Sequence, residues 1–308
     1  MKINTLRCFI HVATSGSFIM TARRFGIPQS TVTRQIAALE AELGHQLLLR
    51  HTRAVALTEA GARYLAEIQP AVEMIDAAAD GLMSADAPLS GIIRLNAPVS
   101  LGTMYVAPLL EMFQEKHPSI SVELILTDRF VDPVQERADI TFRIGKLSDS
   151  GMIARTLGAQ EYLLCASPAY LTKMGHPNSP NDLQAHNCLL YKGQFADQRW
   201  YFRSAGSQQR VAHDVTGNFK SNNAEALLNG ALNGRGIVLF PSWIYGTQTL
   251  SEQLLIPLLR EWDPADESEP HEIHLLYPQG RLRSRKVKAL SEFLCEQIGS
   301  PPAWNVQV

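Results

Sequence analysis

The chain of 308 residues has few cysteines, and no two of them stand close together: Cys8, Cys165, Cys188 and Cys295. The absence of a C-x-x-C pair argues against a zinc ribbon. Four distant thiols also do not make the disulfide framework of a small secreted domain. We therefore expect reduced thiols and a cytoplasmic protein.

Long hydrophobic runs are absent too. No apolar stretch approaches the roughly 18 residues that a transmembrane helix needs, so we expect no membrane partner. The first apolar stretch contains Arg7 and His11, which does not fit a signal peptide. The composition is otherwise that of a globular protein, and the length predicts two or three folding units.

Acidic residues are scarce at the N-terminal end. Residues 1–57 contain seven Lys and Arg but only two acids, Glu40 and Glu42, and the first aspartate is Asp76. This segment carries a charge of +5 and the remainder −7. A basic head on an acidic body indicates an anionic polymer as the partner of the head, although a chance fluctuation of a few charges gives the same totals.

The head has the pattern of a helix-turn-helix. Apolar residues at three-and-four spacing predict a first helix that ends near Gly16 and a second over 18–25 that ends at Gly26. A third helix starts at residue 28 or 29 and closes at Gly44. Its predicted buried face consists of Val32, Ile36, Leu39 and Leu43.

The opposite face of the third helix begins with short polar side chains and one arginine, with no acid among them: Gln29, Ser30, Thr31, Thr33 and Arg34. These groups suit phosphates and base edges in a DNA major groove. Residues 47–57 then indicate a hairpin whose basic tip carries Arg50 and Arg53, as a wing on the sugar-phosphate backbone requires. The alternative is a small three-helix domain that binds nothing.

A long helix is predicted next, with Thr58 as its cap. Its apolar residues form a narrow heptad stripe: Leu65, Ile68, Val72, Ile75, Ala79 and Leu82. Such a stripe favours pairing with a second copy of the chain, and paired heads about 34 Å apart would match paired DNA half-sites. The alternative is a helix packed on its own domain.

From residue 91 onward, predicted strands and helices alternate, which indicates an α/β fold with mostly parallel sheets. Ligands of such folds bind beyond the carboxyl ends of the strands, where helix N-termini point. Two helix starts, at 100–103 and 221–223, are rich in Ser, Thr and Asn and suit a small carboxylate. Ordinary capping of the two helices would place the same residues there.

No motif for catalysis, a cofactor or a metal is found, so the chain is not expected to be an enzyme. Gly234-Arg235-Gly236 lacks the third glycine of a dinucleotide fingerprint and precedes a strand. No G-x-S-x-G elbow occurs, and residues 271–274 lack the spacing of H-E-x-x-H.

Several motifs resemble those of the LysR-type transcriptional regulators. In the head they are Ser15-Gly16-Ser17-Phe18, residues 29–36 (QSTVTRQI), Leu39-Glu40, Leu43-Gly44 and Leu57-Thr58-Glu59-Ala60-Gly61. In the body they are Ala138-Asp139-Ile140, Arg143-Ile144-Gly145, residues 166–171 (ASPAYL) and Tyr277-Pro278. The resemblance spans nearly the whole chain. Departures from the commonest family residues are Thr21, Leu48 and Thr33, the last of which bears on base preference.

The resemblance implies a winged helix-turn-helix over 1–58 and a linker and dimerisation helix with a hinge over 59–90. It further implies two α/β subdomains like those of type 2 periplasmic solute-binding proteins, over 91–163 plus 269–299 and over 164–268, and then a tail over 300–308. A small effector would lie in the cleft between the subdomains. The expected partners are a homodimer that forms a homotetramer, double-stranded promoter DNA with dyad symmetry and a T…A core, and RNA polymerase as a further candidate.

Carried over by position, the effector contacts are Ser100, Thr103, Thr127, Asp128, Arg143, Asn222, Phe240 and Pro241. The sequence therefore predicts a sequence-specific DNA-binding transcriptional regulator that responds to a small effector, with a carboxylate as the candidate class. The alternative is a solute receptor whose head does not read DNA sequence.

Overall fold

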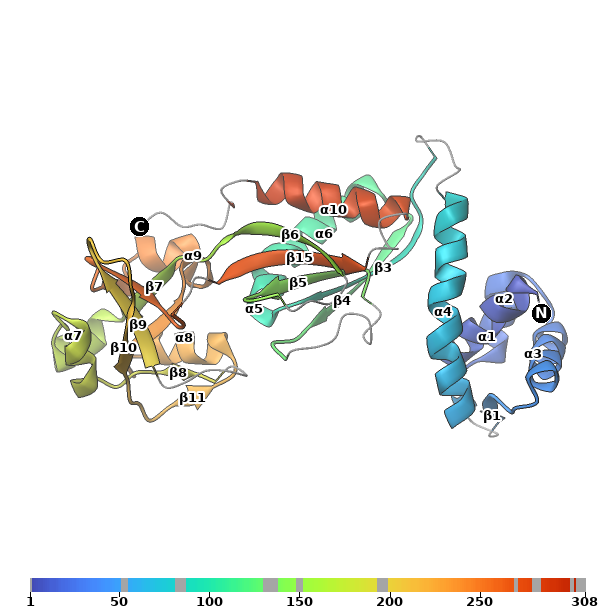
Figure 1. The fold of residues 1–308 in the computed structure, drawn as a ribbon, viewed down its shortest axis with the longest axis horizontal. Helices are drawn as coiled ribbons and strands as arrows, with labels where there is room; N and C mark the ends of the chain where they lie inside the picture. The colour runs from blue at the N-terminus through green and yellow to red at the C-terminus, as the bar shows by residue number, and fades with distance from the viewer. Residues whose placement is uncertain are drawn as a thin grey trace. The chain divides into compact units, whose positions relative to one another are not determined.

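The structure, a computed structural model of the chain, describes residues 2–50, 55–80, 87–129, 138–147, 152–192, 199–268, 271–278, 284–299 and 302. The chain divides into two compact units, one built from the first 85 residues and the other from nearly all the rest. Figure 1 shows both units and labels many of their helices and strands.

The first unit, the head, begins with the three predicted helices: α1 (Ile3–Ser15), α2 (Phe18–Phe25) and α3 (Gln29–Leu43). Each of them ends at a glycine with positive φ: Gly16, Gly26 and Gly44. Only glycine adopts this left-handed conformation without a steric penalty, so the glycines fix the helix ends. Ser17 caps α2, because its side chain accepts a hydrogen bond from the backbone N–H of Met20 at 3.2 Å.

The helices and the following hairpin enclose one apolar core. The hairpin pairs β1 (Leu48–Arg50) antiparallel with β2 (Val55–Leu57). The core includes side chains with at most 1% of their surface exposed: Phe9, Val12, Val32, Ile36, Leu39 and Leu47. Burying each such side chain stabilises the head by about 1.5–3 kcal/mol.

The helix α4 (Glu59–Asp80) packs on this core with its first half. It begins at Thr58, whose Oγ1 accepts a hydrogen bond from the N–H of Gly61 at 2.9 Å. Gly61 lies so close to the hairpin that an added Cβ would stand 2.0 Å from the carbonyl oxygen of Leu47. Leu65 is buried in the head core and Ile68 packs against it, so these two stripe residues follow the alternative of a helix packed on its own domain.

The second unit contains a five-stranded sheet of order β4-β3-β5-β15-β6. Its strands are β3 (Gly91–Ala97), β4 (Ile120–Leu126), β5 (Ile140–Ile144), β6 (Met152–Ala159) and β15 (Glu272–Pro278). The strand β3 is parallel to β4 and β5, whereas β15 is antiparallel to β5 and β6.

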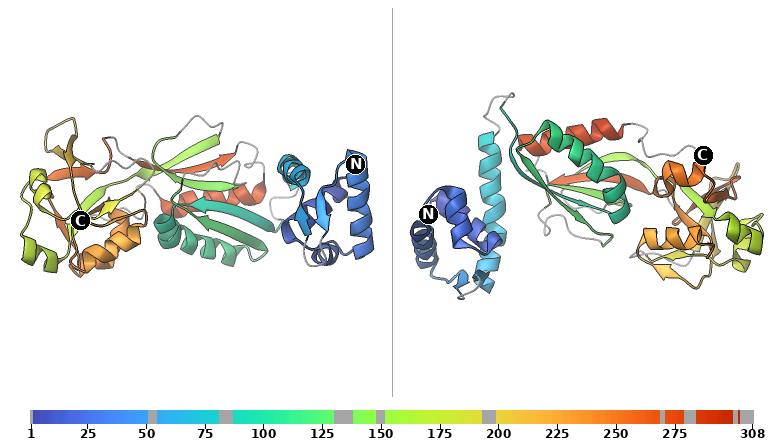
Figure 2. Two further views of the ribbon diagram at one scale, coloured as in Figure 1. Left: turned by 90° about the horizontal axis from the view of Figure 1, so that it is seen from below. Right: turned by 180° about the vertical axis from the view of Figure 1, so that it is seen from behind.

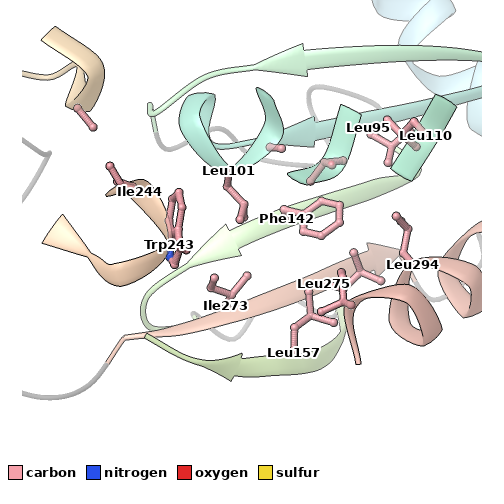
Figure 3. Packing of buried hydrophobic residues seen from close by; sticks show 14 of the residues in the cluster. Leu95, Leu101, Leu110, Phe142, Leu157, Trp243, Ile244, Ile273, Leu275 and Leu294 are labelled. Carbon is pink, nitrogen blue, oxygen red and sulfur yellow. The ribbon is translucent and has the colours of Figure 1, made fainter. Parts of the chain in front are cut away.

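Helices cover one face of this sheet. A helical segment runs from α5 (Val99–Leu101) through a π-helical turn (Gly102–Val106) into α6 (Ala107–Lys116). It lies beside α10 (Arg285–Ile298) on the same face (Figure 2), and the rings of Phe113 and Phe293 are 5.4 Å apart. Figure 3 shows the core between sheet and helices, with side chains from every layer: Leu95, Leu110, Phe142, Leu275 and Leu294.

The remainder of the second unit forms three smaller sheets, of orders β12-β7-β13, β10-β9-β14 and β11-β8. Their strands are β7 (Tyr162–Ala166), β8 (Leu190–Tyr191), β9 (Arg199–Ser204), β10 (Val211–Asp214), β11 (Lys220–Ser221), β12 (Val238–Pro241), β13 (Ile256–Leu258) and β14 (Trp262–Ala265). Their helices are α7 (Pro168–Met174), α8 (Ala224–Leu232) and α9 (Ser242–Ser251), together with a 3₁₀ turn (Pro180–Ala185).

The prediction of mostly parallel sheets is wrong. Among the described strands, only β3-β4, β3-β5 and β8-β11 are parallel pairs, and the other ladders are antiparallel. Strand–helix–strand connections enforce parallel pairing only where two neighbouring strands are joined by a helix, as β3 and β4 are. The chain then makes a hairpin at β9 and β10, and β15 enters the five-stranded sheet from the opposite direction.

We call the five-stranded sheet with α5, α6 and α10 lobe 1, and β7 to β14 with α7 to α9 lobe 2. The chain passes between the lobes twice, once between β6 and β7 and once between β14 and β15. Of the predicted tail, the structure describes Pro302, which is buried and stands against Gly158 of β6. None of the helices within the described residues is both long and apolar enough to cross a membrane.

Candidate functional site

The first turn of α3 presents the predicted polar face. Gln29, Ser30 and Arg34 are exposed, and Thr31 and Thr33 are half-buried, while Val32 and Ile36 of the same helix lie in the core. Pro28 precedes the helix and provides no side-chain cap. The positive end of the α3 dipole therefore lies beside hydrogen-bonding side chains and one guanidinium. This combination suits contacts with DNA phosphates and base edges.

The hairpin is fixed to this helix by a side chain of α3 itself. The Oε1 atom of Glu40 accepts hydrogen bonds from the backbone N–H groups of Leu47 and Leu48, at 2.8 and 3.1 Å. Of the predicted wing residues, Arg50 ends β1, but its side chain lies outside the described part of the chain, as does Arg53 altogether.

The second half of α4 leaves apolar side chains in solvent. Val72 is buried, but Ile75 is 52% exposed and its neighbour Met74 is 54% exposed. Both side chains are large and apolar, as pairing with a second helix requires. The side chain of Ala79 and the whole of Leu82 lie outside the described residues.

A cleft of about 880 Å³ lies between lobe 1 and lobe 2. Six of the eight predicted effector residues line it: Ser100, Thr127, Asp128, Arg143, Phe240 and Pro241. Thr103 and Asn222 do not. The hydroxyl of Thr103 turns back and donates to the carbonyl of Val99 at 2.9 Å, and Asn222 is exposed beside Asn223, which caps α8.

Both helix starts that suited a carboxylate are already capped. The Oδ1 atom of Asp128 accepts a hydrogen bond from the N–H of Val99 at 2.9 Å, where the helical segment of lobe 1 begins. Asn223 Oδ1 accepts from the N–H of Ala226 at 2.8 Å, where α8 begins. Asn223 therefore follows the capping alternative, whereas Asp128, and neither Ser100 nor Thr103, caps the segment of lobe 1. An added carboxylate at Val99 would meet the negative charge of Asp128.

Asp128 also acts electrostatically on Tyr191 of β8, which lines the same cleft from lobe 2. Burial, together with the charge of Asp128, raises the pKa of Tyr191 to about 12, and burial also raises the pKa of Asp128. Tyr191 therefore stays protonated at neutral pH and offers a hydroxyl to the cleft.

The lobes are linked through Trp243 at the start of α9. The hydroxyl of Tyr105 donates to the carbonyl of Trp243 at 2.9 Å, and the indole Nε1 donates to Oε1 of Gln160 at 3.0 Å. Trp243 lies beside Leu101 and Ile273 of lobe 1 (Figure 3). Because Gln160 lies on the first crossing between the lobes, this tryptophan fixes the crossing against both of them.

Basic side chains outnumber acidic ones in the cleft. The basic lining consists of Arg129, Arg143, Lys146, Lys192, Arg199 and Lys220, and the acidic lining of Asp128, Asp266 and Glu267. Two of the acids are near His271, with oxygens 3.6 and 3.0 Å from its ring nitrogens. Burial lowers the pKa of Arg143, the cation on strand β5. The cleft as a whole favours an anion.

Sequence reasoning missed three polar residues of the lining: Asn96, Thr141 and Gln160. They are 3%, 5% and 7% exposed, and Asn96 Nδ2, Thr141 Oγ1 and Gln160 Nε2 have no hydrogen-bond partner. A signal was present, because Asn96 and Thr141 are uncharged polar residues in the strands IIRLNA and ITFRI, which are otherwise apolar apart from one arginine in each. Buried polar groups without partners are rare in native proteins, and here all three line one cleft.

Two family models match the sequence over ranges that fall in the two units. Residues 3–62 match the model of the bacterial regulatory helix-turn-helix protein of the lysR family, and residues 86–299 match the LysR substrate binding domain. The chain belongs to the LysR family of transcriptional regulators. This LysR-type regulator combines a DNA-binding head with an effector-binding domain, and members of the family bind DNA and form oligomers.

The similarity extends over almost the whole chain. It is 36% identical over 294 residues to the uncharacterised HTH-type transcriptional regulator YhjC of Escherichia coli, covering 95% of this chain and 96% of that protein. It is 30% identical to the HTH-type transcriptional regulator CrgA of Neisseria meningitidis, covering 97% and 99%.

Solved structures agree with this assignment. The full-length Vibrio cholerae virulence activator AphB is similar with a TM-score of 0.59 and 30% identity, over 96% of this chain and 99% of that one. The structure of CrgA from Neisseria meningitidis has a TM-score of 0.58 and 29% identity, over 95% and 99%. The assignment favours the regulator over the alternative of a solute receptor whose head does not read DNA sequence.

Proposed function

We propose that this LysR-type regulator responds to a small anionic effector, a carboxylate, that binds in the cleft between lobe 1 and lobe 2. The observation that carries the proposal is the excess of basic over acidic side chains in a cleft of about 880 Å³. That volume lies within the range of about 300–1,000 Å³ that small-molecule sites occupy. Aromatic side chains also line it and suit an apolar part of the ligand, among them Tyr191, Trp200, Phe240 and Trp243.

We propose further that Gln29, Ser30, Thr31, Thr33 and Arg34 of α3 read base edges in the major groove. Arg50 and Arg53 then contact the sugar-phosphate backbone from the hairpin. The exposure of Gln29, Ser30 and Arg34 at the uncapped start of α3 supports this role.

We infer that two heads pair through the exposed second half of α4 and bind a site with dyad symmetry. Two such dimers form a tetramer, and the complex acts at promoters beside RNA polymerase. The exposed Met74 and Ile75 support the pairing.

The effector proposal is tested by measuring binding of the full chain to its selected DNA site in the presence of carboxylates and of their neutral amides. Acetate, succinate and phenylacetate are each compared with the corresponding amide at constant ionic strength. We expect at least one carboxylate to change the DNA affinity or the footprint, while its amide does not. Equal effects of acids and amides, or no effect of any acid, would contradict an anionic effector.

A further inference from the structure

Two of the unpartnered donors stand side by side on the sheet of lobe 1. Asn96 on β3 and Thr141 on β5 are register partners in the parallel ladder. Adjacent strands lie about 4.8 Å apart, and side chains of register partners point to the same face. The two donors are therefore neighbours.

A cation extends this pair along the same strand. Side chains alternate along β5, so Ile140 and Phe142 enter the helix-covered core while Thr141 and Arg143 point to the opposite face. Two residues along a strand span about 6.6 Å, so Arg143 is the next side chain on the face of Thr141. An amide, a hydroxyl and a guanidinium thus share one face of neighbouring strands, and all three line the cleft.

The unpartnered atoms point to a ligand that satisfies them. Asn96 is 3% and Thr141 5% exposed, and neither Nδ2 of the former nor Oγ1 of the latter has a hydrogen-bond partner. A buried polar group without a partner is destabilising, and a ligand with acceptor oxygens removes that penalty on binding.

We propose that Asn96, Thr141 and Arg143 form the subsite that binds the carboxylate of the effector. This inference rests on the proposed anionic effector. It adds where the carboxylate binds, which is on the face of β3 and β5 and not at the helix starts. The amide of Asn96 and the hydroxyl of Thr141 donate to the carboxylate oxygens, and Arg143 supplies the opposite charge. Asp128 already occupies the helix start at Val99, which leaves the strand face as the site for the anion.

The donor set fits one negative charge. Two of its three groups are neutral, and Asp128 lines the same cleft. A phosphate dianion binds best among several cations, whereas a carboxylate needs hydrogen-bond donors for its two oxygens and one countercharge. The ligand class is therefore a monocarboxylate at this subsite.

Thr141→Val tests the subsite, because valine has nearly the shape of threonine but lacks the hydroxyl. The thermal unfolding midpoint of the full chain is measured with sodium acetate as the minimal carboxylate and acetamide as its neutral isostere, at ionic strength held constant with sodium chloride. Without acetate, we expect Thr141→Val to unfold at the same or a higher temperature than wild type, since the lost hydroxyl has no partner. With acetate, we expect the apparent Kd of Thr141→Val for acetate to be about ten-fold higher than that of wild type.

Two further variants control the result. Ser242→Ala also removes a buried, unpartnered hydroxyl, but Ser242 does not line the cleft, so its acetate response should equal that of wild type. Thr141→Ser keeps a hydroxyl and should recover most of the acetate response. Asn96→Asp replaces a donor by an anionic acceptor of the same shape and should abolish the response.

The outcomes separate this inference from the proposed function. Acetate that stabilises wild type and Thr141→Val equally would overturn the subsite and leave an anionic effector elsewhere in the cleft. If acetate stabilises wild type no more than acetamide does, both the subsite and the carboxylate effector fail. Loss of the response in Thr141→Val and its return in Thr141→Ser would establish the subsite.

Discussion

Glu40 on the helix α3 holds the hairpin through the backbone of Leu47, because its Oε1 atom accepts the N–H of that residue at 2.8 Å. The same oxygen accepts the N–H of Leu48 at 3.1 Å. The helix proposed to read bases and the hairpin proposed to follow the backbone are thus joined by one carboxylate. The relative position of these two elements depends on it.

We therefore predict that Glu40→Ala destabilises the head by about 1.5–3 kcal/mol, the usual effect of losing hydrogen bonds to a charged group. Glu40→Gln keeps an acceptor oxygen and should cost less. Urea unfolding of the full chain, followed by hydrogen exchange of the Leu47 and Leu48 amides, measures both effects. Unchanged protection of these two amides in Glu40→Ala would show that the carboxylate does not hold the hairpin.

A second prediction concerns Arg34, exposed on the proposed reading face. Arg34→Ala should weaken binding to the selected DNA site by about 1–3 kcal/mol and relax sequence preference at one position, as expected for a base-edge contact. The control is Arg63→Ala, an exposed arginine on α4 of the same unit. A uniform loss across all sequences with a smaller salt dependence would instead identify Arg34 as a phosphate contact.

The exposed end of α4 gives a third prediction. Ile75→Glu places like charges opposite each other if two α4 helices pair there, and should weaken the dimer about ten-fold or more. Ala66→Glu changes an exposed residue in the half of the helix that packs on the head and serves as the control. Sedimentation equilibrium gives both masses. Equal association of wild type and Ile75→Glu would move the pairing surface away from this residue.

A fourth prediction follows from His274, which is 5% exposed on β15. Its ring is hydrogen-bonded to Thr156 at 3.1 Å, and burial lowers its pKa below the ordinary 6.5. The unfolded chain therefore binds this proton more readily, so acidification below about pH 6.5 favours unfolding. The contribution of His274 is complete above that pH and is lost as the pH falls through the lowered pKa.

His274→Gln removes this titration and should make the free energy of unfolding depend less on pH between about 7.5 and 5. Urea unfolding at a series of pH values compares the variant with wild type. If the free energy of unfolding changes with pH equally steeply in both proteins, the protons taken up on unfolding bind to groups other than His274.

The head was predictable from sequence because local signals there agree with tertiary packing. Gly16, Gly26 and Gly44 end the helices, and the buried face of α3 follows directly from its apolar spacing. Leu65 was harder, because a heptad stripe has the same spacing whether it faces a second copy or its own domain. Only the packing of Leu65 into the head core decides between the two.

The second unit was less predictable, because several of its strands carry weak signals. Pro257 and Pro264 lie in β13 and β14, which are edge strands of their sheets, where a missing N–H is tolerated. The residues carried over from the family resemblance include Ser100 and Arg143, which line the cleft, but not Asn96 or Thr141, which also line it. The sequence shows that these two strand residues are polar, but their lack of hydrogen-bond partners depends on neighbouring strands and is not visible in any local pattern.

If this LysR-type regulator reads a DNA site with two paired heads, the first measurement is selection of DNA fragments by the purified full chain at physiological salt. We expect enrichment of one sequence with dyad symmetry, with half-sites about one helical turn or a multiple of it apart. Binding that falls steeply with salt and enriches no sequence would contradict base reading by α3.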